Sequence, residues 1–291
     1  MQILIAVALL GGLGLIFGLV LAAASKVFYV ETDPRLDALN ECLPGANCGG
    51  CGYAGCGAYA EAVLNGEAPI GACASGGNEC AQKMAAIMGV KAEAVTRKVA
   101  LVRCSGVREY DKDGNMVKGA KTKANYEGFH DCLAASKVGG SGPLSCKFGC
   151  LGYGSCTKAC KYGAIKVVNG VAVVNEDLCV GCMACAAACP RQLIVPVEPK
   201  RNVVIACNSM AKGAATTRAC TVGCIGCGLC KKICPNDAIT VEKGLARIDY
   251  SKCTQCGLCA TVCPKKLIKD SNVENLPDPN TQPKNGPAVN V

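Results

Sequence analysis

Cysteine is the residue type with the most chemistry to offer in this chain, which has 26 cysteines and one histidine among 291 residues. Two runs near the C-terminal end share the spacing C-x2-C-x2-C-x3-C, and each is followed by proline. Their members are Cys224, Cys227, Cys230 and Cys234, and then Cys253, Cys256, Cys259 and Cys263. Small residues between them, such as Gly226 and Gly228, let the backbone fold tightly around a metal centre. Thiolates at these intervals predict iron–sulfur ligation and one-electron transfer.

The fourth cysteine of such a run cannot reach the cluster held by the first three, and it ligates the neighbouring cluster instead. This arrangement is typical of two-cluster bacterial ferredoxins, and it predicts two [4Fe–4S] sites in residues 223–264. The predicted ligand sets are Cys224, Cys227, Cys230 and Cys263 for one cluster, and Cys234, Cys253, Cys256 and Cys259 for the other. Structural zinc is the alternative, but zinc sites usually use pairs of cysteines rather than identical quartets closed by proline.

An earlier segment repeats this pattern with one change. Its second half is regular, and its first half follows the intervals of residues 220–234 without a gap, but Tyr153 stands where Cys227 would align. We expect Cys146 to supply the missing ligand, because its counterpart Cys220 is spare. The predicted sets are Cys146, Cys150, Cys156 and Cys189 for one cluster, and Cys160, Cys179, Cys182 and Cys185 for the other. A three-iron cluster that lacks one cysteine is the alternative at the first of these sites.

A further group of cysteines lies closer to the N-terminus, in a glycine-rich loop. The first three have the spacing C-x2-C-x4-C, and the fourth follows a segment expected to form a helix from Cys56 to Gly66. The predicted ligands of this [4Fe–4S] cluster are Cys48, Cys51, Cys56 and Cys73. Zinc is again the alternative, because this spacing is less specific than the ferredoxin pattern, and Cys80 could substitute for one ligand.

Together these sets predict five [4Fe–4S] clusters. The cysteines left without a predicted ligand role are Cys42, Cys80, Cys104, Cys132, Cys207 and Cys220. The histidine, His130, lies in a polar loop and is expected to be solvated. Regular, cluster-like spacing argues against disulfides and for a reducing compartment. The formal charge of +9 does not predict nucleic-acid binding, because five clusters at about −2 each would contribute roughly −10.

An apolar segment precedes all the cysteines. Residues 3–24 contain no charged side chain, and about 20 apolar residues in a helix are enough to span a bilayer. No lysine or arginine precedes the segment, which favours a retained anchor over a cleaved signal peptide. Lys26 and Arg35 follow it, so the positive-inside rule places the rest of the chain in the cytoplasm. Gly14, Gly18 and Ala22 have the spacing that lets another membrane helix approach closely.

Strand-like segments precede both ferredoxin-like modules. Residues 98–104 and 202–207 are apolar or alternating and end in cysteine, so we expect an internal repeat of a strand and a cluster module. The Asp113-Gly114 pair predicts a hairpin turn. No G-x-G-x-x-G motif opens a helix after a strand, so the sequence predicts no nicotinamide or flavin site on this chain.

The N-terminal motif LPGANCGGCGYAGCGAYAEAV, placed after an apolar span, resembles the B subunit of the Rnf complex. That complex is a membrane-bound ferredoxin:NAD+ oxidoreductase that couples electron transfer to ion pumping. The resemblance runs from the apolar segment to about residue 270. It implies that the Cys48 group binds a [4Fe–4S] cluster, that soluble ferredoxin reduces the chain, and that other membrane and peripheral Rnf subunits receive the electrons on the way to NAD+. The order of the motifs suggests that the C-terminal clusters meet ferredoxin and that the Cys48 cluster lies nearest the membrane exit.

The predicted fold class is α+β, with a single N-terminal transmembrane helix, a small four-cysteine iron–sulfur domain and two tandem bacterial-type 2[4Fe–4S] ferredoxin modules. The predicted parts are an anchor at 1–25, an N-terminal [4Fe–4S] domain at 26–90, a first ferredoxin-like module at 97–196 with its preceding strand and hairpin, a second module at 200–269 and a disordered tail at 270–291. The predicted location is a prokaryotic inner membrane. The alternative functions are electron donation to a redox-sensing iron–sulfur transcription regulator, a stand-alone membrane-anchored polyferredoxin, and a zinc-bound scaffold.

Overall fold

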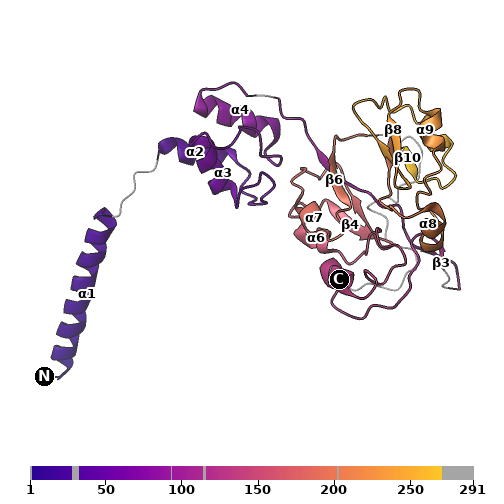
Figure 1. Cartoon of the computed structure of the whole chain (residues 1–291). Coiled ribbons are helices and arrows are strands. Elements are labelled where there is room, and N and C mark those ends of the chain that lie inside the picture. Colours follow the sequence, from indigo (N-terminus) through magenta and orange to yellow (C-terminus); the bar gives the residue numbers. More distant parts are fainter. Residues whose placement is uncertain (1, 28–32, 93, 114–115, 202, 271–291) are drawn as a thin grey trace.

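The computed structural model describes residues 2–27, 33–92, 94–113, 116–201 and 203–270. Helix α1 (Gln2–Val27) extends away from the rest of the chain (Figure 1), and its side chains are described at Ile5 and at residues 10–26. Within the part of the chain that the structure describes, no helix is long and apolar enough to cross a membrane. From residue 271 onward, the predicted tail lies outside the described residues.

Three helices fold around the N-terminal cysteine group: α2 (Pro34–Cys42), α3 (Cys56–Leu64) and α4 (Gly77–Met88). Helix α2 begins at Pro34, and the preceding Asp33 caps it, because the Asp33 carboxylate accepts the N–H of Arg35 at 2.9 Å. The centre of this domain is formed by one fully buried side chain from each helix: Leu39, Tyr59 and Met84. The helices therefore supply a small apolar core that leaves the cysteine loop at one side.

The first ferredoxin module is a hairpin flanked by two short helices. Its elements in chain order are α6 (Ser155–Ala159), β4 (Ile165–Val168), β5 (Val171–Val174) and α7 (Ala184–Ala187). Strand β1 (Val99–Val102) precedes the module and pairs antiparallel with β6 (Ile194–Val197), which follows the last cysteine of the module. This strand pair closes the module over a core of valine, isoleucine, leucine and cysteine side chains.

The second ferredoxin module repeats this plan. Its elements are α9 (Leu229–Ile233), β8 (Ile239–Glu242), β9 (Leu245–Ile248) and α10 (Leu258–Thr261). Strand β7 (Val203–Ile205) precedes it and pairs antiparallel with β10 (Ile268–Asp270), which again follows the last cysteine. The predicted repeat of a strand followed by a cluster module is therefore confirmed, and Figure 1 shows the two copies as neighbouring lobes.

The segment between β1 and α6 connects the two lobes. It contains the antiparallel pair β2 (Glu109–Tyr110) and β3 (Met116–Lys118), so the predicted hairpin is confirmed, although Gly114 of its turn lies outside the described residues. Isolated β-bridges join Ala120 to Cys220 and Thr122 to Leu144. Two further short helices, α5 (Cys132–Lys137) and α8 (Gly213–Ala219), pack at this junction. The segment is thus held against residues of both modules.

Candidate metal centres

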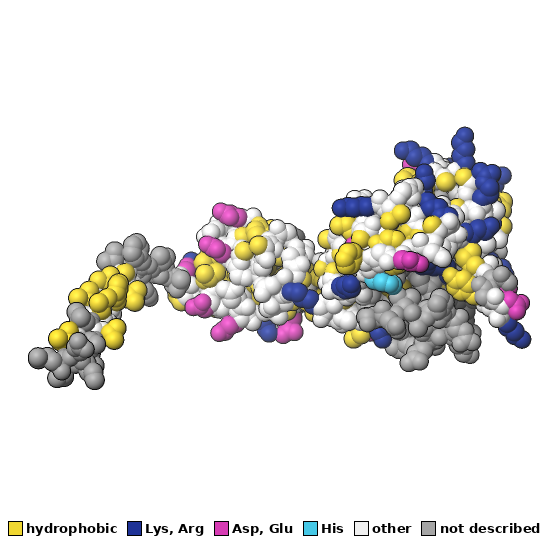
Figure 2. Space-filling model, turned by 90° about the horizontal axis from the view of Figure 1, so that it is seen from below, with side chains coloured by type: hydrophobic (Ala, Val, Ile, Leu, Met, Phe, Trp, Pro, Cys, Tyr) yellow, Lys and Arg dark blue, Asp and Glu magenta, His cyan; other side chains and the backbone are white. Residues whose placement is uncertain are grey.

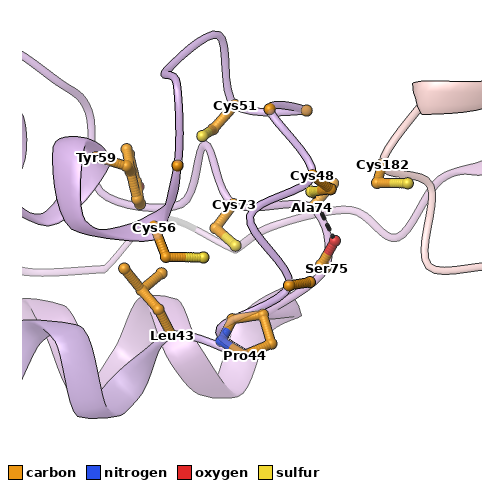
Figure 3. Close-up of a pocket in the computed structure, with 14 residues that line it drawn as sticks. Leu43, Pro44, Cys48, Cys51, Cys56, Tyr59, Cys73, Ala74, Ser75 and Cys182 are labelled. Carbon is orange, nitrogen blue, oxygen red and sulfur yellow. Dashed lines mark hydrogen bonds between the residues drawn. The ribbon is translucent and has the colours of Figure 1, made fainter. Parts of the chain in front are cut away.

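The four cysteines predicted to hold the N-terminal cluster surround one pocket (Figure 3). Cys48, Cys51, Cys56 and Cys73 line it, and its empty volume is ≈ 350 Å³. The loop is fixed at its end, because the side-chain oxygen of Asn47 accepts the N–H of Cys56 at 2.8 Å. The Ser75 hydroxyl lies 3.5 Å from the sulfur of Cys48. The loop and the start of α3 therefore bring four thiols to a common centre.

A fifth cysteine, Cys182 of the first ferredoxin module, lines the same pocket. The two parts of the chain meet closely, since a Cβ atom added to Gly50 would lie 2.4 Å from the carbonyl oxygen of Cys182. The Lys161 ammonium also donates to the carbonyl oxygens of Ala46 and Asn47, the latter at 3.3 Å. The N-terminal cysteine loop is thus docked on the first ferredoxin module.

Cys182 also belongs to a second pocket, which its own module forms. This pocket has an empty volume of ≈ 340 Å³ and is lined by the predicted quartet Cys160, Cys179, Cys182 and Cys185. The N–H of Ala100 donates to the sulfur of Cys179 at 3.4 Å, so strand β1 contributes to the site. One cysteine therefore lies between two predicted cluster sites.

The second module contains two pockets of the same kind. One, of ≈ 380 Å³, is lined by Cys224, Cys227, Cys230 and Cys263. The other, of ≈ 330 Å³, is lined by Cys234, Cys253, Cys256 and Cys259. In each pocket, the structure thus brings together three cysteines from one half of the module and one from the other half, as predicted. Ligation by these sets stays a prediction.

The remaining predicted quartet is divided. Cys150, Cys156 and Cys189 lie in the core of the first module. Cys146 belongs to a different apolar cluster, where it packs near Cys220. It lines a pocket together with Cys104, Cys207 and Cys220. The structure therefore brings Cys146 to three cysteines for which the sequence predicts no ligand role.

These pockets have the properties that a [4Fe–4S] cluster requires. Backbone N–H groups of Ala238 and Gln255 each donate to a cysteine sulfur at 3.4 Å, as they do around bound clusters. Close backbone approach requires glycine at Gly181, which has a φ of +71° and whose added Cβ would lie 2.2 Å from the Lys98 carbonyl oxygen. Burial raises the pKa of the Cys259 thiol to about 11, so its thiolate needs a nearby positive centre.

The arrangement of four cysteines around each pocket suits a cluster better than a single ion. Among the described residues, no three cysteine, histidine or acidic side chains converge closely enough to hold one metal ion. In a cubane each thiolate binds a separate iron atom, so the ligands surround a larger volume than in a mononuclear site. The residues present therefore fit [4Fe–4S] clusters.

Three family models match the cysteine-rich parts of the chain. A model described as "Putative Fe-S cluster" matches residues 43–75, a 4Fe-4S binding domain matches residues 172–195, and a 4Fe-4S dicluster domain matches residues 223–267. The chain is 43% identical over 252 residues to the B subunit of the Na(+)-translocating ferredoxin:NAD(+) oxidoreductase complex of Acetobacterium woodii, an alignment that covers 86% of this chain and 73% of that protein. It is 40% identical over 264 residues to the B subunit of the ion-translocating oxidoreductase complex of Methanosarcina acetivorans, with coverage of 90% and 96%. This chain belongs to the family of Rnf B subunits.

A third Rnf B subunit is also similar over most of its length. This relative, from the proton-translocating ferredoxin:NAD(+) oxidoreductase complex of Clostridium ljungdahlii, is 43% identical over 243 residues, which are 83% of this chain and 82% of that protein. The names specify Na(+) for the first relative, protons for the third and no particular ion for the second. The family assignment therefore does not identify an ion for this chain.

In this member of the Rnf family, Cys80 is placed beside the N-terminal site rather than in it. Cys80 does not line the pocket, but its thiol donates to the sulfur of Cys73 and thereby lowers the pKa of Cys73. Gly76 lies against both sulfurs: its added Cβ would be 2.8 Å from that of Cys80 and 3.4 Å from that of Cys73. Sequence spacing alone does not reveal this contact, because both cysteines lie in one irregular stretch.

The structure also places two predicted non-ligands near the irregular site. The ring of His130 contacts that of Tyr153 at a centroid distance of 5.7 Å, and Tyr126 lies on the same Tyr153 ring at 5.1 Å. Burial, and to a lesser extent the nearby Cys132, raises the pKa of Cys156. The alignment of the two modules places Tyr153 at a ligand position. It could not reveal that Cys132 lies nearby, because Cys132 precedes the module in the chain.

Proposed function

We propose that this chain is the iron–sulfur electron-transfer subunit of a membrane complex that oxidises ferredoxin, reduces NAD+ and translocates ions. The observation that carries the proposal is the position of Cys182, which lines both the N-terminal pocket and a pocket of the first ferredoxin module. Adjacent cysteine sites form a path for electrons, and the chain has no predicted substrate site of its own. The names of the relatives supply the reaction of the complex.

The chain would carry at least five [4Fe–4S] clusters as a series of one-electron sites, four of them at predicted quartets that each line one pocket. When bound, such clusters exchange single electrons at potentials set by burial, net charge and hydrogen bonds to the sulfurs. The protein's part is to hold the thiolates, to exclude water with its apolar core and to donate backbone N–H groups to the sulfurs. The potential at each site then depends on how many such donors the local backbone supplies.

The second module is the proposed entry for electrons from soluble ferredoxin. Cys227 and Cys256 are exposed, so two of its cluster sites reach the surface. Figure 2 shows Lys and Arg side chains gathered over this end of the molecule, and Asp and Glu side chains over the N-terminal domain. The exposed basic residues of the module include Lys231, Lys232, Lys243, Arg247 and Lys252. A basic surface around an entry site speeds association with an acidic electron donor.

The N-terminal domain is the proposed exit, close to a membrane. Residues 3–24 form the proposed single anchor, with the remainder of the chain on the cytoplasmic side of a prokaryotic inner membrane, because basic residues follow the apolar run and none precedes it. The N-terminal pocket is the cysteine site nearest to this segment in the chain, so electrons would leave it towards the membrane subunits of an Rnf complex. We propose no nucleic-acid partner.

The deciding experiment measures ferredoxin-dependent NAD+ reduction in membranes of the source organism. Deletion of this chain should abolish the activity, and the full-length chain should restore it. A chain lacking residues 1–25 should not restore it in washed membranes. Unchanged activity without the chain would overturn the proposal and would favour the alternative of a donor to a redox-sensing regulator.

The direction of transfer has a separate test. Cys48→Ser should leave ferredoxin binding intact and block electron transfer to the membrane subunits. If Cys48→Ser instead abolished ferredoxin binding and left transfer to the membrane intact, entry and exit would be reversed.

A further inference from the structure

Four cysteines meet between the two ferredoxin modules. They are Cys104, Cys146, Cys207 and Cys220, and we call the pocket that they line the interface pocket. Its empty volume of ≈ 360 Å³ falls within the range of the four pockets lined by predicted quartets, which run from ≈ 330 to ≈ 380 Å³. None of these thiols forms a disulfide. The interface pocket therefore matches the predicted cluster sites in its ligand number and in its size.

The interface pocket is built from equivalent positions of the two modules. Cys104 follows β1 and Cys207 follows β7, the strands that occupy the same place in the two copies of the repeat. Cys146 and Cys220 are also equivalent, because each lies four residues before the first regular cysteine of its module. That cysteine is Cys150 in the first module and Cys224 in the second. Each module thus contributes the same two ligand positions to one shared site.

The hydrogen bonds at these sulfurs repeat in the same way. The sulfur of Cys104 accepts the N–H of Gly106 at 3.4 Å and the N–H of Cys150 at 3.3 Å. The sulfur of Cys207 accepts the N–H of Ser209 at 3.5 Å and the N–H of Cys224 at 3.4 Å. In both modules, one N–H donor lies two residues after the accepting cysteine, and the other donor is the N–H of the first regular cysteine of the module. Donors of this type also contact the sulfurs of the predicted ligands Cys234 and Cys253.

The walls of the interface pocket leave room for a cluster and separate it from water. Cys104, Cys146 and Cys220 are 6–8% exposed, Cys207 is half-buried, and the wall residues Ala120 and Ala206 are each 2% exposed. Gly149 faces the sulfurs, since its added Cβ would lie 3.4 Å from that of Cys146 and 3.8 Å from that of Cys104. Small residues at these positions keep the space between the thiols open.

We propose that Cys104, Cys146, Cys207 and Cys220 bind a sixth [4Fe–4S] cluster, shared by the two ferredoxin modules. A mononuclear zinc site fits less well, because no three ligand side chains among the described residues converge on a single ion. The pocket size and the N–H donors to sulfur are those of the iron–sulfur sites elsewhere in the chain. This ligand assignment does not depend on the proposed function.

Cys132 then replaces Cys146 as the fourth ligand of the first-module cluster. The Ser155 hydroxyl accepts the N–H of Cys132 at 2.7 Å and donates to the Asp131 carboxylate at 2.6 Å, which fixes Cys132 beside the start of α6. Cys156 is the second residue of this helix. Tyr153, which occupies the position of the missing ligand, packs against the same apolar cluster as Cys132. The first-module cluster thus takes the ligands Cys132, Cys150, Cys156 and Cys189.

The shared cluster would join the two modules into one electron path, a role that rests on the proposed electron-transfer function. Cys150 and Cys224 are predicted ligands of the clusters on either side, and each donates its N–H to a sulfur of the interface pocket. Transfer of one electron to the shared cluster would leave the neighbouring cluster oxidised by one electron and the shared cluster reduced by one electron. No bond or proton changes in this step.

The test counts clusters in the full-length chain, purified anaerobically in detergent. Six clusters predict about 24 iron and 24 sulfide per chain, and five predict about 20 of each. Cys104→Ser and Cys207→Ser should each lose about four iron, whereas the matched control Cys42→Ser, which lies outside every ligand set, should lose none. Native mass spectrometry of the wild-type chain gives the cluster number directly, even if a variant fails to fold.

The outcomes separate the two ligand assignments. Cys132→Ser should also lose about four iron under this proposal, and none if Cys146 serves the first-module cluster. A wild-type count of five clusters with iron unchanged in Cys104→Ser and Cys207→Ser would overturn the shared cluster. One zinc per chain that disappears in Cys207→Ser would overturn it in favour of a structural zinc site. Each of these counts is independent of ferredoxin:NAD+ activity.

Discussion

Cys80 is expected to tune the potential of the N-terminal cluster without binding iron. Its thiol donates a hydrogen bond to the sulfur of Cys73. A donor to a ligand sulfur stabilises the more negative, reduced state of a cluster and so raises its reduction potential. Cys80→Ala removes this donor, and the reduction potential of the N-terminal cluster should therefore fall.

The magnitude of the fall follows from the strength of one hydrogen bond. A typical intramolecular hydrogen bond contributes about 0.5 to 1.5 kcal/mol, and a thiol is a weak donor. For a one-electron couple about 1.4 kcal/mol corresponds to about 59 mV, so the expected fall is about 20 to 60 mV. The single hydrogen of the Cys80 thiol is shared with the sulfur of Met84, to which it donates at 3.7 Å. Cys80 is also only 4% exposed, so the alanine variant loses some packing in the core.

The assay is a redox titration of the full-length chain followed by EPR, with iron counted in each sample. Cys80→Ser keeps a donor at the same position and should lie closer to the wild type than Cys80→Ala. Cys42→Ala is the control, because Cys42 packs against the same core and is in no ligand set. An unchanged potential in Cys80→Ala would refute the hydrogen-bond argument. Loss of about four iron would show that Cys80 is a ligand instead.

Three further changes test the packing around the sites. Gly50→Ala should push the N-terminal loop away from Cys182 by about 1 Å, because its Cβ would otherwise lie 2.4 Å from the Cys182 carbonyl oxygen. Freeze-quench EPR should then show slower electron exchange with the N-terminal cluster. The control Gly57→Ala should leave this exchange unchanged, because its added Cβ meets nothing closer than 3.8 Å. Arg108→Ala removes donors to the Gly170 carbonyl at 2.8 Å and the Leu151 carbonyl at 3.3 Å, and should lower the free energy of unfolding by about 2 to 3 kcal/mol in denaturant titrations. Stripping iron from the chain should make both ferredoxin modules sensitive to limited proteolysis, because cysteines form much of their cores.

Local sequence signals located the elements that position the sites. The apolar segments predicted as strands before each module are β1 and β7 in the structure. In the second module, each pocket is lined by one of the cysteine sets that the spacing C-x2-C-x2-C-x3-C predicts, because this spacing fixes which sulfurs one loop can present. Ligation by these sets stays a prediction. These features depend on residues that are close together in the chain.

The features that the sequence could not provide depend on contacts between distant segments. Cys104 and Cys220 meet only because both modules pack on the segment between β1 and α6, and no interval between them indicates this. Likewise, the spacing within the first module suggested Cys146 as a replacement ligand, whereas the position of Cys132 depends on a hydrogen bond to Ser155. Alignment of the two repeats revealed which ligand position was altered, but not which residue approaches it from outside.

The docking of the N-terminal loop against Cys182 makes the N-terminal domain a tethered partner rather than a diffusing one. The connection from α4 to β1, residues 89–98, can reach at most about 35 Å when fully extended. A domain that leaves the module therefore stays at a local concentration in the millimolar range and returns without a search through solution. Electron exchange across this contact should not depend on protein concentration, and dilution that separates soluble carriers would leave it unchanged. If the anchor holds one side of this tether at the membrane, the linker also limits how far the ferredoxin modules can move from the bilayer surface.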